Sequence, residues 1–448
     1  MGGERLNGKQ ELKQRSLNSE IWHLLWPVLL LTLAQKLGAA FEGVLVSVNN
    51  PDELTVIGIC HPYTNLITTV SHGFSIGINS MVGRAVGGGY WNACRKKAEK
   101  LFLLILLGCS CVMSLVTAGA LAVAFSDAPE LASMGWSYMM PYLLGSPVLL
   151  LFSAIIAAMR GLGHTDTGMW MTFLSVPLQV GISWFCYTNF GVGALGYGII
   201  LARLAGSLYG YRCYRKEISP ASEAALPAGF ARDFVKLAIP VSLSKAISPV
   251  ASAAINELLF AIGAVYVGAS GLGGRLEVFF YIPAMAMGTV AITVVARQGK
   301  DADLFAICKR LCLWSILPTL IFSIAAGLLR DPVWAMLTPD AATQEAGRLY
   351  WSCVLWAYPL IALEMTTTSV LQALGLGMPA LVITVIRLWG IQLPAAWLSA
   401  QLGWGPVGVW AGFVLSNLLS ALISIVWAGY KFKNRTKTTA DDSRRKRR

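Results

Sequence analysis

The stretch Val82-Gly-Arg-Ala-Val-Gly-Gly-Gly89 ends a long apolar run, and Val295-Ala-Arg-Gln298 ends a second one in the other half of the chain. Landmarks in and around these stretches pair at a nearly constant spacing. Pro27/Pro240 and Arg84/Arg297 have the same separation, and the pairs Tyr138/Tyr350, Pro147/Pro359, Gly163/Gly375 and Gly196/Gly408 share a separation that is shorter by a single position. These matched pairs predict that the chain contains the same helical bundle twice. Two similar membrane bundles are the usual architecture of a secondary transporter, which handles its substrate between them.

The composition is that of a membrane protein. Of the 448 residues, 56% are hydrophobic and only 13% are charged, and the mean hydropathy is +0.61. So few charged residues cannot coat a water-facing surface of this size. A membrane-spanning helix needs roughly 20 mainly apolar residues. The sequence therefore predicts an all-α polytopic membrane protein with about twelve spans. They lie near residues 20–46, 54–82, 101–125, 132–159, 168–190, 193–213, 233–262, 265–296, 303–328, 343–373, 379–401 and 406–430.

The basic residues outside the predicted spans alternate from one side of the membrane to the other. They gather in the N-terminal tail, the second loop, the connection between the halves, the eighth loop and the C-terminal tail. The opposite side contains only Arg330 and Arg348. Because positively charged loops stay in the cytoplasm, this pattern predicts an even number of helices with both termini cytoplasmic. We expect a multi-pass protein of the plasma (inner) membrane, and the distribution of the +12 net charge argues against a nucleic-acid partner.

The repeat predicts two six-helix lobes. An even number of spans per lobe makes both lobes enter the membrane in the same direction, so a pseudo-two-fold axis along the membrane normal is expected to relate them. The predicted segments are a cytoplasmic N-terminal tail (1–19), an N-terminal lobe (20–213), a cytoplasmic linker (214–231), a C-terminal lobe (232–430) and a basic cytoplasmic tail (431–448). The run Ser443–Arg448 favours a disordered tail over specific lipid recognition. We expect a monomer that encloses its own cleft, unlike an oligomeric channel.

Nothing in the sequence predicts an enzyme, a metal site or a bound cofactor. The nine cysteines are scattered, lie mostly in apolar spans and lack a metal-ligand spacing such as Cys-x-x-Cys. They are interpreted as small packing residues. The sequence has no paired-histidine, Asp-rich or Ser/His constellation. It also lacks the Gly-x-x-x-x-Gly-Lys-Ser/Thr loop that binds nucleotide phosphates, so ATP is not expected to be a direct energy source within this chain.

Several motifs, in their order along the chain, resemble those of the multidrug and toxic compound extrusion (MATE) transporters. They are Ile21-Trp22, Trp26-Pro27, Val82–Gly89 followed by Arg95-Lys96-Lys97, Met159-Arg-Gly-Leu-Gly-His-Thr165, Arg275-Leu-Glu277, Ile282-Pro283 and Val295–Gln298. The resemblance covers nearly the whole chain and depends on the order and spacing of the motifs together. It implies a twelve-helix exporter that exchanges drugs or metabolites for protons or sodium ions by alternating access.

The chain departs from that family's pattern at the cation site. One branch of the family has an acidic residue a few turns after the first-span proline, where this chain has Glu42. The same branch has an Asn-x-x-x-Asp pattern in the fifth span, where this chain has Gln179 and Ser183, so the supporting carboxylate is missing. A second branch uses acidic residues in spans seven and ten. Glu257 and Glu364 lie in those spans but not at the matching positions, so the chain resembles a divergent member.

Acidic residues inside the predicted spans are candidates for cation coupling. A charge at mid-membrane costs at least about 2.5 to 3.5 kcal/mol unless it is paired, hydrated or neutralised. Glu42 shares a helical face with Gly38 and Gln35, and burial on that face would favour proton loading and release. Alternatively, Glu42 pairs with Lys36 or Lys245 and only holds helices together. The coupling candidates are Glu42, Glu257 and Glu364.

Polar side chains form stripes at helical spacing on spans two, seven and ten. Such a stripe must face protein or water, because lipid cannot satisfy its hydrogen bonds. Three stripes together predict a hydrated central cleft, although polar contacts between helices explain any one of them equally well. The candidates for the cleft and the substrate site are Gln35, Lys36, His72, Asn79, Gln179, Lys245, Asn256 and Thr368.

The charge of the substrate stays open between a cation and an anion or zwitterion. A cleft for organic cations usually combines excess acid with aromatic surfaces. Here the bases within the spans outnumber the acids by one: Lys36, Arg203, Lys245, Arg275 and Arg387 against Glu42, Glu257, Glu277 and Glu364. The predicted function is a proton- or sodium-coupled antiporter that exports small organic molecules, including cationic drugs. The alternative is a flippase of the same fold superfamily that moves a lipid-linked polar headgroup, whose phosphates would suit a basic cleft.

Overall fold

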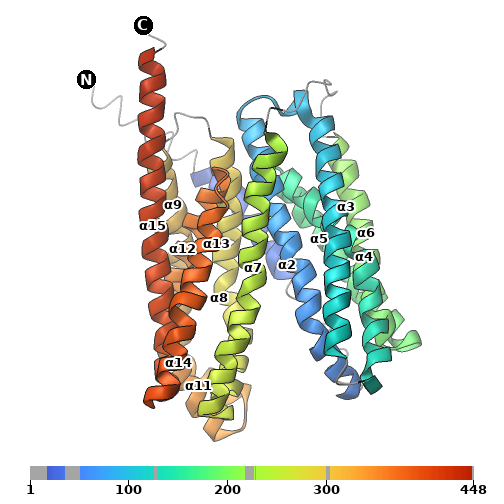
Figure 1. Cartoon of the computed structure of the whole chain (residues 1–448), viewed down its shortest axis with the longest axis vertical. Coiled ribbons are helices and arrows are strands. Elements are labelled where there is room, and N and C mark those ends of the chain that lie inside the picture. The colour runs from blue at the N-terminus through green and yellow to red at the C-terminus, as the bar shows by residue number, and fades with distance from the viewer. Residues whose placement is uncertain are drawn as a thin grey trace. The chain divides into compact units, whose positions relative to one another are not determined.

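The protein folds as two separate bundles of long helices. The computed structural model describes residues 18–35, 51–125, 129–216, 227, 229–298 and 303–445. Over these ranges the chain is almost entirely helical and contains no β-strand. It divides between Ala231 and Arg232 into two compact units, here called the N-terminal unit and the C-terminal unit. Figure 1 shows the helices of each unit running roughly parallel to one another.

The N-terminal unit begins with a helix over residues 18–35. Five longer helices and one short 3-10 turn follow: α2 (Pro51–Gly87), α3 (Trp91–Ala124), α4 (Pro129–Leu162), α5 (Thr165–Phe190), η1 (Val192–Ala194) and α6 (Leu195–Lys216). A core of buried side chains from α2, α3, α4, α5 and α6 includes Ile67, Leu121, Met139, Tyr187 and Leu195.

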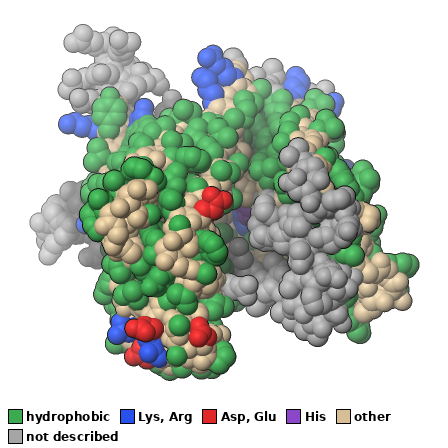
Figure 2. Space-filling view, turned by 60° about the horizontal axis from the view of Figure 1, so that its bottom comes forward, with side chains coloured by type: hydrophobic (Ala, Val, Ile, Leu, Met, Phe, Trp, Pro, Cys, Tyr) green, Lys and Arg blue, Asp and Glu red, His purple; other side chains and the backbone are tan. Residues whose placement is uncertain are grey.

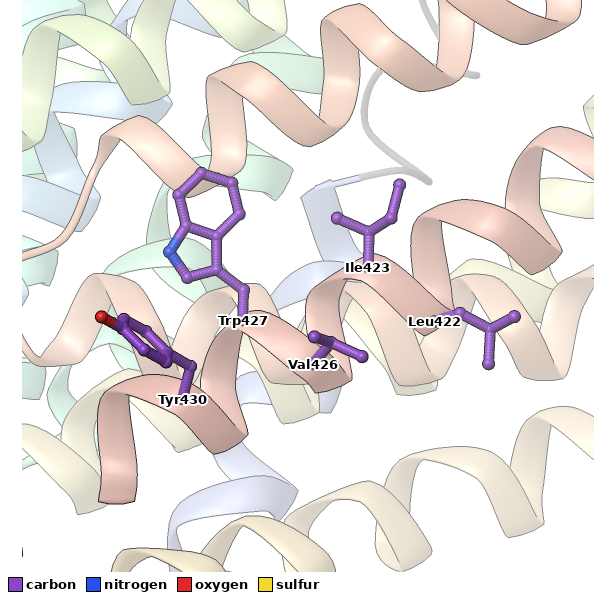
Figure 3. Close-up of a pocket in the computed structure, with 5 residues that line it drawn as sticks. All are labelled: Leu422, Ile423, Val426, Trp427 and Tyr430. Carbon is purple, nitrogen blue, oxygen red and sulfur yellow. The ribbon is translucent and has the colours of Figure 1, made fainter. Parts of the chain in front are cut away.

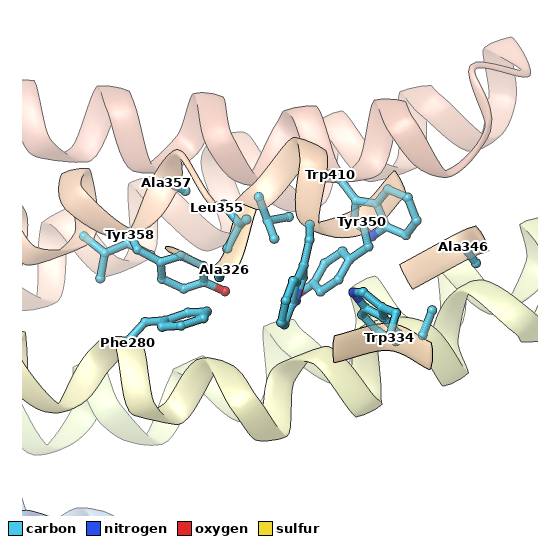
Figure 4. Close-up of a cluster of buried hydrophobic side chains, with 13 residues drawn as sticks. Phe280, Ala326, Trp334, Ala346, Tyr350, Leu355, Ala357, Tyr358 and Trp410 are labelled. Atoms are coloured by element: carbon cyan, nitrogen blue, oxygen red, sulfur yellow. The ribbon is translucent and has the colours of Figure 1, made fainter. Parts of the chain in front are cut away.

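The C-terminal unit contains the remaining helices. They are α7 (Phe230–Ile262), α8 (Ala264–Arg297), α9 (Leu304–Leu328), α10 (Arg330–Leu337), α11 (Ala341–Val354), α12 (Ala357–Ala373), α13 (Met378–Val385), the π-helix η2 (Ile386–Gln392), α14 (Leu393–Leu402) and α15 (Gly405–Arg445). An aromatic core joins α8, α10, α11, α12 and α15 (Figure 4). Helix α15 continues well past residue 430, where the sequence places the end of the last span.

These helices confirm the prediction of an all-α polytopic membrane protein. Within the described ranges, nine helices are long and apolar enough to cross a membrane, and a tenth span results if the bent pair α11 and α12 is counted as one. The helix over residues 18–35 and helix α2 overlap the first two predicted spans, 20–46 and 54–82. Each of the other predicted spans overlaps one of these ten.

The two units repeat the same helix terminations, which supports the duplication seen in the sequence. Gly163 and Gly375 follow the ends of α4 and α12 with φ of 91° and 86°. The backbone N–H of each glycine donates to the carbonyl three residues earlier, at Arg160 (2.8 Å) and Gln372 (2.9 Å). The next N–H donates to the carbonyl five residues earlier, at 2.9 Å and 3.0 Å. Both ends are therefore Schellman caps, for which glycine is favoured because it adopts positive φ without strain.

The packing of the fourth span is also repeated. In the N-terminal unit, α4 packs against α2, α3, α5 and α6. In the C-terminal unit, α12 packs against the corresponding helices α8, α9, α13 and α15. The fourth span is thus the central helix of both bundles, and side chains on it are placed to contact most of the other spans of the same unit.

The C-terminal unit differs from its counterpart in two local breaks. Helices α11 and α12 meet at a bend of 48°. Pro359 lies just after this bend. In a continuous helix, the backbone N–H of residue 359 would donate to the carbonyl of Leu355. Proline has no N–H to donate and its ring clashes with that carbonyl, so a break is expected there. Pro147 occupies the equivalent place in α4, which nevertheless stays continuous. The second break is η2, a π-helical turn in the eleventh span.

The surface of the C-terminal unit is mainly hydrophobic along the helices, and at the end drawn at the bottom left of Figure 2 acidic and basic side chains lie together. Ion pairs at that end join Asp331 to Arg330 (3.7 Å) and to Arg348 (3.3 Å). Among the exposed large apolar side chains are Leu328 (79%) on α9 and Val426 (72%) on α15. This distribution is typical of helices whose outer faces contact lipid acyl chains.

Candidate functional site

Three charged residues inside the C-terminal unit lie near one another. Lys245 lies near the middle of α7, Glu364 lies on α12 and Arg387 lies in η2. Lys245 interacts electrostatically with both of the other residues, attractively with Glu364 and repulsively with Arg387. Glu364 is 9% exposed, whereas Lys245 is exposed and Arg387 is half-buried. Three helices that are distant in sequence therefore bring two bases and one acid together.

Arg387 is the second residue of the π-helix η2. A π-helical turn is rare and is often found at functional sites. The Nη1 of Arg387 donates to Oδ1 of Asn417 on α15 at 3.2 Å. Asn417 is itself fully buried, and its Nδ2 donates to the Phe413 carbonyl at 2.7 Å. The Nε of Arg387 has no hydrogen-bond partner among the described residues, so one nitrogen of the guanidinium is fixed and another is unused.

The N-terminal unit has a comparable arginine. Arg387 lies on the fifth span of its unit and contacts the sixth, whereas this arginine lies on the sixth span of its unit and contacts the fifth. Arg203 on α6 donates from Nη1 to the Ser175 hydroxyl on α5 at 3.1 Å. Its guanidinium also lies 4.5 Å from the ring centre of Phe152. Ser175 is the counterpart of Arg387 in the repeat, since the two have the same separation as Gly163 and Gly375. Each unit thus joins its last two spans through an arginine, and the arginine of the C-terminal unit also interacts electrostatically with Lys245.

A second buried acid, Glu277, is surrounded by tyrosines. Glu277 on α8 is 6% exposed. The hydroxyls of Tyr350 and Tyr358 lie beside its carboxyl group, and Tyr281 interacts with it electrostatically. Its Oε1 has no hydrogen-bond partner within the described part of the chain. Figure 4 shows Tyr350 and Tyr358 in the aromatic core, with Tyr358 packed on Phe280 at a ring-centre distance of 5.2 Å.

The predicted coupling residues have very different surroundings. Glu364 is buried, and in the described structure no side chain donates a hydrogen bond to its carboxylate. Glu257 is exposed near the end of α7. Glu42 lies outside the described residues, and so does Lys36. Of the two acids that the structure describes, Glu364 interacts electrostatically with a predicted cleft residue, Lys245.

The other predicted cleft residues are spread over both units. In the N-terminal unit, Gln35 is half-buried and His72 is exposed, whereas Asn79 and Gln179 are 3% and 2% exposed. In the C-terminal unit, Asn256 is exposed on α7. Thr368 is 6% exposed, and its hydroxyl donates to the Glu364 carbonyl of its own helix at 2.8 Å.

The polar stripes on α7 and α12 therefore have opposite environments. On α7, Lys245, Ser252 and Asn256 are exposed. On α12, Glu364, Thr368 and Gln372 are all buried. The stripe on α12 packs inside its own unit, which fits the interpretation of polar contacts between helices, while the stripe on α7 is open.

In the sequence, Arg387 and Glu277 are counted only among the charged residues within the spans, and their surroundings cannot be read from the sequence. The π-helical turn that contains Arg387 has no local sequence signature. Tyr350 and Tyr358 lie on two helices joined by a bend, so simple helical periodicity does not place them beside one carboxylate. One signal is present: a charged residue within an apolar run is expected to have a polar partner on a neighbouring helix.

A surface groove on α15 lies apart from these charges and is apolar. It has a volume of about 460 Å³ and is lined by Leu422, Ile423, Val426, Trp427 and Tyr430 (Figure 3). Among these lining residues, only the indole N–H of Trp427 and the hydroxyl of Tyr430 are polar. A groove of this kind on a membrane-spanning helix suits an acyl chain, and its lining lacks the charged groups that would orient a polar substrate.

Comparison with protein families supports the duplication. A family model described as MatE matches residues 27–185 and again residues 240–398. The two matched segments begin at Pro27 and Pro240, which are the prolines that pair in the sequence repeat.

Among characterised relatives, a probable multidrug resistance protein NorM of Thermotoga maritima is 20% identical over 386 residues, which cover 83% of each chain. A FAD transporter of Shewanella oneidensis is 25% identical over 417 residues, covering 87% of this chain and 89% of the relative. A multidrug resistance protein MdtK of Cronobacter sakazakii is 22% identical, covering 90% and 92%.

Solved structures share the fold of this chain. A MATE structure in complex with MaL6 has a TM-score of 0.84 at 19% identity, covering 94% of this chain and 97% of that chain. A MOP superfamily transporter from Pyrococcus furiosus, described as having a binding pocket of reverse polarity, has a TM-score of 0.85 at 18% identity over the same shares. The two-lobe arrangement of about twelve helices predicted from the sequence is therefore confirmed at the level of the fold.

Proposed function

This chain belongs to the MatE family, and from that membership we propose that it is a cation-coupled antiporter that exports small organic molecules. The family and its multidrug relatives support transport across the plasma membrane by alternating access. The coupling ion, a proton or a sodium ion, and the exchange of that ion for substrate are the parts that we propose. The observation that carries the proposal is that the family match, the helix caps and the packing of the fourth span each occur twice.

Coupling requires a group whose charge changes when the cation binds. We propose that this group is one of the three predicted carboxylates, Glu42, Glu257 or Glu364. Glu364 is the buried one among those that the structure describes. Binding of a cation there would change the charge balance with Lys245 and hence the relative stability of two conformations. Cation and substrate must prefer different conformations for exchange to occur, because a ligand that prefers neither shifts no equilibrium.

The substrate is proposed to be a small organic molecule, bound by a single copy of the chain. Two of the relatives are named multidrug resistance proteins, and one is named a FAD transporter. These names suit substrates of either charge, so the transport assay should include both. The flippase alternative is supported by the two bases Lys245 and Arg387, which would suit the phosphates of a lipid-linked headgroup.

The decisive experiment is transport by purified protein in proteoliposomes. A pH gradient or a sodium gradient is imposed, and movement of ethidium, a cation, and of carboxyfluorescein, an anion, is recorded by fluorescence. We expect one gradient to drive uptake of at least one probe. One of Glu42→Gln, Glu257→Gln and Glu364→Gln should reduce the gradient-driven rate by about 5- to 150-fold, the range of typical coupling free energies.

The matched control is Glu345→Gln. Glu345 is an exposed carboxylate of α11 in the same unit as Glu257 and Glu364, so its neutralisation should leave the rate unchanged. If neither gradient moves either probe, antiport of soluble organic molecules is wrong. Scrambling of a fluorescent lipid-linked headgroup in the same vesicles, without a gradient, would then establish the flippase alternative.

A further inference from the structure

Helix α7 has two exposed faces of opposite chemistry. Ile239, Leu243 and Val250 share one face and are 53%, 46% and 58% exposed. Lys245 and Ser252 share a different face and are also exposed. With 3.6 residues per turn, the two sets lie on roughly opposite sides of the helix. The apolar face can contact lipid, but the polar face cannot, because unsatisfied polar groups are too costly in hydrocarbon.

Lys245 forms no ion pair with any residue that the structure describes. Within the part of the chain that the structure describes, no carboxylate lies within ion-pair distance of Lys245 or Arg387. Glu364 attracts Lys245 from farther away, and Arg387 repels it. Among the described residues, the electrostatic partners of Lys245 are one acid and one further base, so the acid does not balance both bases. An uncompensated charge near the middle of a membrane helix requires water or a counter-ion.

Arg387 is held in a fixed position with donors to spare. Its Nη1 is bound to the buried Asn417, at 3.2 Å, which limits the movement of the guanidinium. Its buried Nε has no partner among the described atoms. A guanidinium presents five N–H donors in a planar fork, and an ammonium supplies a mobile point charge. Together they are the groups that proteins commonly use to bind carboxylates and phosphates.

We propose that Lys245 and Arg387 form an oxyanion-binding subsite, which holds a carboxylate or phosphate group of the transported molecule. This proposal rests on the proposed transport function in one respect: the molecule that binds the subsite is taken to be the transported substrate. Glu364 acts as the counter-charge of the empty subsite, and Asn417 positions Arg387. Substrate sites of secondary transporters usually lie near the bilayer midplane, and Lys245 and Arg387 are both near the middle of their spans.

The sign of this arrangement restricts where antiport coupling can occur. Neutralising Glu364 makes the subsite more positive, so a proton on Glu364 and an oxyanion in the subsite favour each other. Two ligands that favour each other's binding move together and are not exchanged. Exchange of a proton for an oxyanion therefore needs the coupling carboxylate to be Glu42 or Glu257, with Glu364 serving the substrate.

Ligand-induced stabilisation of the purified protein tests the subsite without any gradient. The probes are inorganic pyrophosphate and citrate at constant ionic strength, and the readout is the unfolding temperature from tryptophan fluorescence. A ligand that binds the native state raises this temperature. We expect at least one probe to stabilise the wild type. Lys245→Met and Arg387→Met should weaken its apparent affinity by about tenfold or more, because each loses a charge-assisted contact. Glu364→Gln should strengthen it.

Arg203→Gln is the matched control. Arg203 is a half-buried membrane arginine that also donates to a side-chain oxygen on the neighbouring helix. Its replacement therefore measures the general effect of losing a membrane arginine. We expect this variant to bind the probe as the wild type does. If a methionine variant does not fold, Lys245→Arg and Arg387→Lys keep the charge and should retain binding, whereas Lys245→Gln should not.

Three results would overturn the subsite. They are no stabilisation by either anion or by phosphatidylglycerol, equal stabilisation of the wild type and both methionine variants, and weaker binding in Glu364→Gln. Phosphatidylglycerol added to the micelles identifies the source of the oxyanion. Stabilisation by this lipid that depends on Lys245, without an effect of either soluble probe, would assign the subsite to a lipid headgroup. Failure of gradient-driven transport alone leaves the binding result standing and overturns only the antiport.

Discussion

Two buried glutamates of the C-terminal unit have different neighbours, and the neighbours indicate different roles. Glu277 and Glu364 are both buried. Glu277 lies among tyrosine hydroxyls in the aromatic core, whereas Glu364 lies near Lys245, whose side chain is exposed. A charge that is surrounded by packed rings stabilises one arrangement of helices. A charge that shares its surroundings with an exposed base can respond to a ligand.

The glycines that cap α4 and α12 should be intolerant of substitution. Gly163→Ala or Gly375→Ala places a Cβ at φ of 91° or 86°, which costs about 1 to 2 kcal/mol for an L-residue. We expect each variant to lower the unfolding temperature of the purified protein. Gly119→Ala is the control, because a Cβ there meets no atom within 4 Å and alanine favours a helix. Equal effects at Gly119 and Gly375 would show that the caps are not under this constraint.

Among the helices, α7 contacts other helices of its unit on both sides of Lys245. Near the start, Leu237 of α7 is fully buried, and its backbone lies against Gly377. Near the other end, Ile255 and Leu259 pack in an apolar cluster with Ala396 of α14 and Val409 of α15. Lys245 lies between these two contacts. The helix is thus held on both sides of the basic pair, which fixes the position of Lys245 while leaving its side chain accessible.

The first of these contacts should depend on the small size of Gly377. A Cβ at this position would lie 2.5 Å from the carbonyl oxygen of Leu237 and 3.0 Å from its Cα. Because backbone atoms cannot rotate away, Gly377→Ala should destabilise the unit by about 1 to 3 kcal/mol. The unfolding temperature and the affinity for pyrophosphate are both expected to fall. Gly429→Ala on α15, where a Cβ meets nothing within 4 Å, should change neither. An unchanged unfolding temperature in Gly377→Ala would contradict this packing argument.

The positions of the spans could be predicted from the sequence, because apolar run length is a local property. The breaks within them could not. Pro147 and Pro359 are equivalent in the repeat, yet α4 is continuous and the tenth span bends by 48°. A proline in the sequence therefore does not predict whether its helix stays continuous or bends, because packing by neighbouring helices can compensate for the lost hydrogen bond.

The candidate site was only partly predictable, because periodicity shows that residues share a face but not what that face contacts. The stripe of Glu364 is buried and the stripe of Lys245 is exposed. Their proximity to Arg387 depends on the tertiary packing of three helices and on a π-helical turn.

At the scale of the whole molecule, each unit has its own buried core. The N-terminal core includes Ile67, Met139 and Leu195, and the C-terminal core includes Trp334, Trp351 and Tyr358. The described side chains of each of these two cores belong to a single unit. Two units that each have their own core suit a mechanism in which each lobe moves as a rigid body.

The orientation of the chain in the membrane is predicted by its basic loops and can be measured with fusions. A fluorescent protein attached after Arg448 should fluoresce, and alkaline phosphatase attached there should be inactive, because both termini are predicted to be cytoplasmic. The reverse is expected for fusions in the loop between α10 and α11, at Pro339. Active phosphatase at the C-terminus would contradict the predicted topology, and the fusions at Pro339 act as the internal control.

The repeated helix caps show that the two halves keep the same backbone geometry where their side chains differ. Gly163 and Gly375 adopt nearly the same φ, whereas Ser175 and Arg387, at equivalent positions, do not carry the same charge. A complex of two identical half-length chains would carry each charged group twice. A single chain with two unlike halves can place a charge in one half alone, so its halves can differ in what they bind.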